Sequence, residues 1–233
     1  VKTLLDTYPD AKCELEYKTP YELLVATVLS AQSTDVRVNI VTKELFKNYN
    51  TPEKILKLGE EKLMEYIKSI GFYNVKSKNI IALSHLLIQN YDSQVPEQMD
   101  ELLKLPGVGR KTANVVLSNC FGVPAIAVDT HVFRVSTRLG FSDKKDPLQV
   151  EQDLMKKISK KYWTDAHHAF IFHGRRVCKA RNPMCELCSV QSYCKFYNTS
   201  QTSQVFGQHQ KQARHKQKRY DYKLRYLHLH LAH

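Results

Sequence analysis

Long apolar runs are missing from this sequence. A membrane-spanning helix needs about 20 predominantly apolar residues, and the best run, from Leu23 to Leu29, is soon interrupted by Ser30 and Gln32. Acidic residues and a proline occupy the amino-terminal segment, where a signal peptide would place an apolar block. We therefore expect a soluble, cytoplasmic protein without a membrane partner.

Glycine and proline are also scarce. The 233 residues include 8 glycines and 8 prolines, too few for a collagen-like chain or a Pro/Gly-rich disordered chain. No period of about 20 to 50 residues recurs, which argues against a solenoid. With 42% hydrophobic and 25% charged residues, the composition is that of a folded globular protein with one large domain or two smaller ones.

Strand signals hardly appear, whereas helix signals recur along the chain. Thr19, Pro20 and Glu22 form a capping box with proline in the first turn, and Thr51 and Asp146 begin helices in a similar way. The sequence therefore predicts an all-α fold. Further segments with helical apolar spacing are Lys62 to Ile70, Val75 to Tyr91, Gln98 to Lys104, Arg110 to Phe121, Val132 to Leu139 and Asp165 to Val177.

Basic residues outnumber acidic ones. The chain has 35 Lys and Arg against 23 Asp and Glu, a net charge of +12. Such an excess commonly marks a protein that binds a polyanion, although a solvated basic surface without a partner has the same composition. Residues 198–233 hold seven bases and one acid and lose the apolar periodicity. We predict that they form a basic, low-complexity tail that is disordered or weakly helical.

Four of the six cysteines crowd into one short segment, at Cys178, Cys185, Cys188 and Cys194. In a reducing compartment such a cluster is more suited to binding metal than to forming disulfides. Zinc is the usual metal for four cysteines. The gap of six residues between the first two cysteines departs from the paired spacing of zinc sites, and it favours a 4Fe-4S cluster.

The segment from Leu105 to Ala113 joins two predicted helices. Gly107 and Gly109 permit a tight turn with outward-facing N–H groups, and a helix begins at Arg110. Exposed amides at the positive end of a helix form a seat for an anion such as a DNA phosphate. A P-loop is excluded because no strand precedes the segment and because Arg110 separates Gly109 from Lys111. A purely structural helical corner remains the alternative.

Two residues, Lys111 and Asp129, are candidates for a catalytic role. Lys111 lies in the first helical turn, where the helix dipole and Arg110 disfavour its ammonium form. A neutral lysine amine is a nucleophile suited to Schiff-base formation, whereas a lysine that contacts phosphate needs no such environment. Asp129 follows an apolar run and precedes a helix, so it can cap that helix or act as the acid-base or charge-stabilising partner of Lys111.

Together these motifs resemble the endonuclease III family of DNA glycosylases with apurinic/apyrimidinic lyase activity. The resemblance covers roughly Val1 to Tyr197 and rests on the hairpin, the cysteine spacing, Leu29 to Asp35, and Val128 to His131 at its distance from Lys111. It implies two helical domains that flank a DNA-binding cleft. Residues 13–125 would form a six-helix barrel with a helix-hairpin-helix, and residues 1–12 and 126–197 a 4Fe-4S cluster domain.

The resemblance also implies roles for individual residues. Lys111 and Asp129 would be the catalytic pair, and the four clustered cysteines would be the 4Fe-4S ligands. Gln32 aligns with a residue that fills the space left by a flipped nucleotide, and Phe72 aligns with an intercalating wedge that is often leucine. The remaining implied DNA contacts are Gly107, Gly109, Arg110, Lys179 and Arg181.

The expected protein is a monomeric, bifunctional glycosylase and lyase of base excision repair. It would excise oxidised pyrimidines from double-stranded DNA and cleave abasic sites. Two alternatives stay open. One is an adenine-mismatch-type glycosylase, a branch that generally lacks the lysine found here at Lys111. The other is a non-catalytic helix-hairpin-helix protein with structural zinc, which would have no need to combine Lys111 with Asp129.

Overall fold

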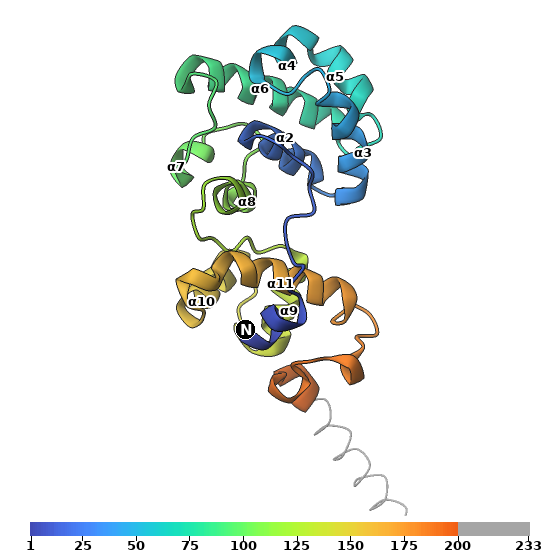
Figure 1. The fold of residues 1–233 in the computed structure, drawn as a ribbon, viewed down its shortest axis with the longest axis vertical. Coiled ribbons are helices and arrows are strands. Elements are labelled where there is room, and N and C mark those ends of the chain that lie inside the picture. The colour runs from blue at the N-terminus through green and yellow to red at the C-terminus, as the bar shows by residue number, and fades with distance from the viewer. Residues whose placement is uncertain (200–233) are drawn as a thin grey trace, which may run out of the picture.

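The computed structural model describes residues 1–199, and the regular elements in that range are all helical (Figure 1). This confirms the predicted all-α class. Apart from its first two positions, the predicted tail at residues 198–233 lies outside the described residues. No described helix is long and apolar enough to cross a membrane.

One group of helices, drawn at the top of Figure 1, comes from consecutive segments of the chain. It shares a hydrophobic core in which Leu24, Leu45, Ile80 and Val116 are fully buried. The short helix α7 and the following α8 form the helix-hairpin-helix. The members are α2 (Pro20–Ser30), α3 (Asp35–Leu45), α4 (Pro52–Leu58), α5 (Glu60–Ile67), α6 (Tyr73–Tyr91), α7 (Met99–Leu102) and α8 (Arg110–Cys120).

The second group, drawn below, combines the amino-terminal helix with the carboxy-terminal part of the described chain. Helix α1 packs against α11, and the Thr7 hydroxyl is hydrogen-bonded to the Ser189 hydroxyl at 2.9 Å. Leu4, Val135 and Phe170 meet in this second core. The members are α1 (Lys2–Thr7), α9 (Thr130–Leu139), α10 (Pro147–Lys157), α11 (Trp163–Arg176) and the 3-10 helices Lys160–Tyr162, Cys185–Leu187 and Gln191–Tyr193.

Local sequence begins three helices as predicted. Thr19, Thr51 and Asp146 are the N-caps of α2, α4 and α10, and each side chain accepts a hydrogen bond from the backbone N–H three residues later. The side-chain oxygen thereby satisfies a donor that has no partner within the helix. A proline follows each cap, and its restricted φ suits the first turn.

Two helices, α1 and α3, do not follow from apolar periodicity. Helix α1 has only six residues, too few to display a helical period. In α3, Val36 and Ile40 are 71% and 58% exposed, whereas Val38 and Val41 are buried. Apolar residues therefore lie on both faces of α3, and the hydrophobic pattern does not reveal the helix. The other predicted bounds differ from the observed ones by at most three residues.

Candidate active site and cysteine cluster

The hairpin between α7 and α8 depends on a close approach to α6. Gly107 has a φ of +78°, and a Cβ at this position would lie 2.9 Å from Nδ2 of Asn79. Glycine adopts this left-handed conformation without strain and, because it has no Cβ, avoids the contact with Asn79. Gly109 is the N-cap of α8 and has no side chain to bond the first-turn amides. Those amides are thus accessible to an anion.

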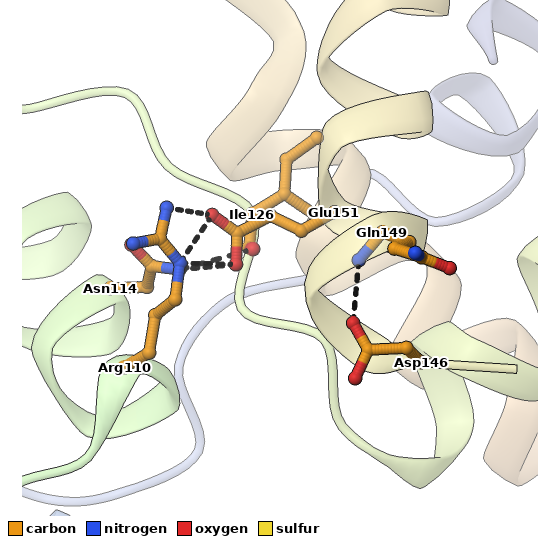
Figure 2. Close-up of polar contacts among 6 residues, drawn as sticks. All are labelled: Arg110, Asn114, Ile126, Asp146, Gln149 and Glu151. Atoms are coloured by element: carbon orange, nitrogen blue, oxygen red, sulfur yellow. Dashed lines mark hydrogen bonds and ion pairs between the residues drawn. The ribbon is translucent and has the colours of Figure 1, made fainter. Parts of the chain in front are cut away.

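The side chain of Arg110 joins the two groups of helices (Figure 2). Its Nη2 lies 2.7 Å from Oε1 of Glu151, and its Nε lies 3.0 Å from the same oxygen. Asn114 donates to Oε2 of Glu151 at 3.2 Å and to the carbonyl of Ile126 at 3.4 Å. The Glu151 side chain is only 6% exposed. Arg110 therefore holds α8 against α10.

Lys111 and Asp129 line one pocket between the two groups of helices. Lys111 is the second residue of α8, and Asp129 is the N-cap of α9. Oδ1 of Asp129 accepts a hydrogen bond from the Val132 N–H at 2.7 Å. The capping role suggested by the sequence is therefore present, and it leaves the carboxylate on the wall of the pocket that also holds Lys111.

Asp35 and Arg175 add charges to this pocket, and their place in it does not follow from the sequence. Arg175, near the end of α11, forms ion pairs with Glu14 and with Asp35, the latter at 2.7 Å. Burial raises the pKa of Asp35, while the nearby Lys111 opposes that rise. The motif from Leu29 to Asp35 contains this carboxylate, but only the fold brings α3 and α11 together.

Gln32 and Phe72 lie on two neighbouring turns. Both have left-handed backbone conformations, with φ of 56° and 59°. Gln32 lines the pocket with Lys111 and Asp129. A Cβ on Gly71 would lie 3.7 Å from the Gln32 carbonyl oxygen, so the turn that carries Phe72 is adjacent to Gln32. The Phe72 side chain is 64% exposed, which leaves an aromatic ring at the surface beside the pocket.

Lys76 supports the turn that carries Gln32, a role that was not identified from the sequence. Its Nζ donates to the carbonyls of Leu29 and Ala31 at 2.8 and 2.6 Å. These carbonyls end α2, where a cation is favoured by the helix dipole. Burial nevertheless lowers the pKa of Lys76. The contact holds in place the backbone that leads into Gln32.

The four clustered cysteines line a single cavity at the end of α11. Burial raises the pKa of Cys188, and the other three thiolates raise it further. A positively charged metal centre would offset both penalties, so the donor set fits a cluster held by thiolates. The residues are Cys178, Cys185, Cys188 and Cys194.

Arg138 on α9 anchors the cysteine loop, a role the sequence did not indicate. Its guanidinium donates to the carbonyls of Lys179 and Ala180 at 2.7 and 3.0 Å and to Sγ of Cys178 at 3.5 Å. The side chains of Lys179 and Arg181 are exposed on the same loop. This arrangement leaves both of the predicted phosphate-contacting charges directed to solvent.

Both the helical region and the cysteine segment of this chain match known protein families. Residues 25–160 match the HhH-GPD superfamily of base excision DNA repair proteins, and residues 178–194 match the iron-sulfur binding domain of endonuclease III. The endonuclease III of Rickettsia felis is 56% identical over 191 residues, covering 82% of this chain and 90% of the relative. That of Escherichia coli is 47% identical over 193 residues, covering 83% of this chain and 92% of the relative.

Solved structures of endonuclease III are also similar to this chain. A non-covalent endonuclease III–DNA complex aligns with a TM-score of 0.82 and 51% identity, covering 86% of this chain and 94% of that one. A trapped covalent endonuclease III–DNA intermediate, an estranged-adenine complex, aligns with the same TM-score, identity and coverage.

The fold, the hairpin and the pocket define a helix-hairpin-helix protein of base excision DNA repair. Within that class the chain belongs to the endonuclease III family. It is therefore a DNA-binding enzyme, a bifunctional DNA glycosylase and apurinic/apyrimidinic lyase, and it carries a 4Fe-4S cluster. The family resemblance in the sequence is confirmed, and the non-catalytic alternative with structural zinc is not supported.

Proposed function

We propose that the enzyme excises oxidised pyrimidines from double-stranded DNA with Lys111 as the nucleophile and Asp129 as its electrostatic partner. The observation that carries this proposal is that both side chains line one pocket between the two groups of helices. The exposed backbone amides of the hairpin lie at the start of α8, directly before Lys111. A phosphate bound there would bring a flipped nucleotide close to that amine.

In the proposed reaction, Nζ of Lys111 in its neutral form attacks C1′ of the flipped nucleotide. The N-glycosidic bond breaks, and its electron pair leaves with the damaged base, which takes up a proton. The Asp129 carboxylate stabilises the positive charge that develops on the sugar and assists the proton transfers. The C1′–O4′ bond then breaks with its electron pair leaving on O4′, which takes up the proton released by Nζ, and a Schiff base remains between Nζ and C1′.

β-Elimination then cleaves the strand. A proton is removed from C2′, a double bond forms between C2′ and C3′, and the C3′–O bond breaks with its electrons leaving on the phosphate. This cut lies on the 3′ side of the lesion. None of these steps transfers an electron, so we assign the bound 4Fe-4S cluster a structural role in folding the loop and positioning DNA.

The proposed DNA contacts are of two kinds: some help to flip the damaged nucleotide, and the others bind phosphates of the DNA backbone. Phe72 would enter the base stack and Gln32 would fill the space left by the flipped nucleotide, and their adjacent turns support this pairing. The backbone amides at Gly107, Gly109 and Arg110 would hold a phosphate. The exposed side chains of Lys179 and Arg181 would add phosphate contacts from the cysteine loop.

We also propose the organisation that this function requires. Residues 13–125 form the barrel domain, and residues 1–12 and 126–197 form the cluster domain, whose ligands are the four clustered cysteines. Support comes from the two separate hydrophobic cores, one on each side of the pocket. The proposed acting species is a monomer, because each residue assigned to the reaction belongs to this one chain.

Borohydride trapping tests the assignment of Lys111. Wild-type protein should become covalently attached to duplex DNA that contains an oxidised pyrimidine or an abasic site, because borohydride reduces a Schiff base to a stable amine. Lys111→Ala should abolish trapping while duplex binding persists, since the hairpin amides remain. Lys104→Ala is the matched control, because this lysine pairs with Glu101 on the hairpin surface. Undiminished trapping in Lys111→Ala would assign the nucleophile to another residue.

A further inference from the structure

Lys76 is a buried basic residue in the first turn of α6, and the reaction proposed above does not use it. An ammonium group that is removed from water needs hydrogen-bond acceptors. Nζ of Lys76 has two, the carbonyl oxygens of Leu29 and Ala31 at 2.8 and 2.6 Å. Carbonyls at the end of a helix have no donor within that helix. The side chain of Lys76 therefore joins the end of α2 to the start of α6.

One end of this connection is the turn that carries Gln32. The carbonyl of Ala31 belongs to the peptide group that leads directly into Gln32, and Nζ of Lys76 bonds that carbonyl. Gln32 has a left-handed φ of 56°, a conformation that a residue with a Cβ keeps only when its surroundings hold it. Rotation of the Ala31 peptide group would redirect the Gln32 side chain. The bond from Lys76 opposes that rotation.

The other end of the connection is the turn that carries Phe72. Phe72 is the N-cap of α6 and has a left-handed φ of 59°. The backbone N–H of Lys76 donates to the Phe72 carbonyl at 3.0 Å. The two turns also touch, because a Cβ on Gly71 would lie 3.7 Å from the carbonyl oxygen of Gln32. Lys76 thus bonds Phe72 through its backbone and the residue before Gln32 through its side chain.

We propose that Lys76 is a positioning residue for nucleotide flipping, which fixes the turn of Gln32 relative to the turn of Phe72. This inference rests on the roles proposed above for those two side chains. A wedge that opens the base stack and a side chain that fills the vacated space must enter the duplex at a fixed separation. Because Lys76 bonds both turns before DNA is bound, the two side chains are already arranged when they meet the duplex.

Lys76→Met tests this role, because methionine fills similar space but donates no hydrogen bond. The measurement is single-turnover reaction of the full chain with its cluster on two duplexes of one sequence. One duplex carries an oxidised pyrimidine and the other a preformed abasic site. We expect excision of the base to be about tenfold slower, because misaligned side chains compensate less of the lost stacking. Cleavage at the abasic site should stay within about twofold of wild type, because no base must be expelled.

Lys76→Gln is a milder variant that carries the test if Lys76→Met does not fold. Its shorter side chain keeps an amide donor that can bond one of the two carbonyls after a small shift. We expect its excision rate to lie between those of wild type and Lys76→Met, again with little change at the abasic site. Thermal unfolding and the cluster absorbance of each variant establish that it is folded. Wild-type excision in a folded Lys76 variant would overturn the proposal.

Tyr21→Phe is the matched control, because it removes another buried polar contact between the same two helices. The Tyr21 hydroxyl is hydrogen-bonded to the Ser84 hydroxyl at 2.7 Å. This contact lies at the start of α2, whereas Lys76 bonds the end of that helix. We expect Tyr21→Phe to keep the wild-type ratio of the two rates. The same change of ratio in Tyr21→Phe and Lys76→Met would mean that any loosening of α2 on α6 has this effect, which would overturn a specific role for Lys76.

A double-mutant cycle with Phe72→Ala separates positioning from a merely structural role. If Lys76 acts by placing the wedge, the combined loss in Lys76→Met with Phe72→Ala should be smaller than the product of the two single losses. Losses that multiply, or equal losses of Lys76→Met on both substrates, would overturn the proposal. Equal losses of Phe72→Ala on both substrates would instead overturn the proposed wedge, and this inference with it. A difference between substrates in Phe72→Ala that is missing in Lys76→Met overturns the role of Lys76 alone.

Discussion

Asp129 meets a structural and a chemical requirement with one side chain. Its Oδ1 accepts the Val132 N–H at the start of α9, and its carboxylate lines the pocket that contains Lys111. Because the cap restricts the side-chain torsions, the negative charge is already in place when substrate arrives. Asparagine caps helices about as well as aspartate but carries no charge.

Asp129→Asn should therefore separate the two roles. We expect single-turnover excision to fall by at least about 100-fold, because the charge that stabilises the developing cation is lost. The thermal unfolding midpoint should change little, because the cap to Val132 can still form. Excision at the wild-type rate would leave Asp129 with capping alone.

Phe72 combines an exposed ring with a strained backbone. A left-handed φ of 59° is unusual for an aromatic residue, and the ring is 64% exposed. Phe72→Ala should slow excision of a base from duplex DNA far more than it slows cleavage at a preformed abasic site, because flipping costs a few kcal/mol of stacking only when a base must still be expelled. Rates measured on the two substrates with one duplex sequence decide this, and equal losses would contradict the wedge.

At the scale of elements, the position of α8 depends on its attachment to α10. Arg110 and Asn114 both bond Glu151, whose carboxylate is nearly buried (Figure 2). Lys111 follows Arg110 directly, so this attachment also sets where the amine lies relative to the second group of helices. A carboxylate with four donor contacts is costly to replace, because its partners lose their acceptor.

Glu151→Gln should lower the free energy of unfolding by about 2 kcal/mol. This is less than the ~3 to 5 kcal/mol typical of a broken buried pair, because the Arg110 side chain is 44% exposed and can be hydrated. Urea unfolding provides the measurement. Glu101→Gln is the control, since its pair with Lys104 is exposed and should contribute under about 1 kcal/mol. Equal effects of the two substitutions would show that the buried attachment is unimportant.

At the scale of the whole molecule, the two hydrophobic cores lie on either side of the reactive pocket. The proposed groups come from both sides: Gln32 and Lys111 from the first group of helices, and Asp129 from the second. The Arg175 ion pairs with Glu14 and Asp35 connect α11 across this boundary. The pocket therefore exists only when both groups of helices are folded and joined.

The seven bases in residues 198–233 should strengthen DNA binding without affecting the chemistry. Each neutralised phosphate contributes about 0.9 to the slope of log K against log salt. If about half of the bases engage at once, deleting residues 200–233 should reduce that slope by roughly 3 in magnitude. Single-turnover excision at saturating enzyme should barely change. Titrations across a salt series measure the slope, and superimposable lines for the two proteins would exclude a role for this segment in binding.

The sequence by itself determined those features that depend on neighbours along the chain. The caps at Thr19, Thr51 and Asp146 follow from side chains that bond amides three residues away. The cysteine spacing indicated an iron-sulfur cluster, and the hairpin glycines indicated a tight turn, because each pattern is complete within about 20 residues. Family resemblance extended this to a glycosylase and lyase with Lys111 and Asp129 as its proposed pair.

Tertiary structure alone decided which distant residues meet. From the sequence, Arg110 is predicted to contact DNA. In the structure its side chain also pairs with Glu151, which is 41 residues away on α10. Asp35, Arg175 and His167 line one pocket only because the fold brings the start of α3 next to α11, where Arg175 pairs with Asp35. Such contacts depend on long-range packing and leave no local pattern, and α3 itself was concealed because its apolar residues lie on two faces.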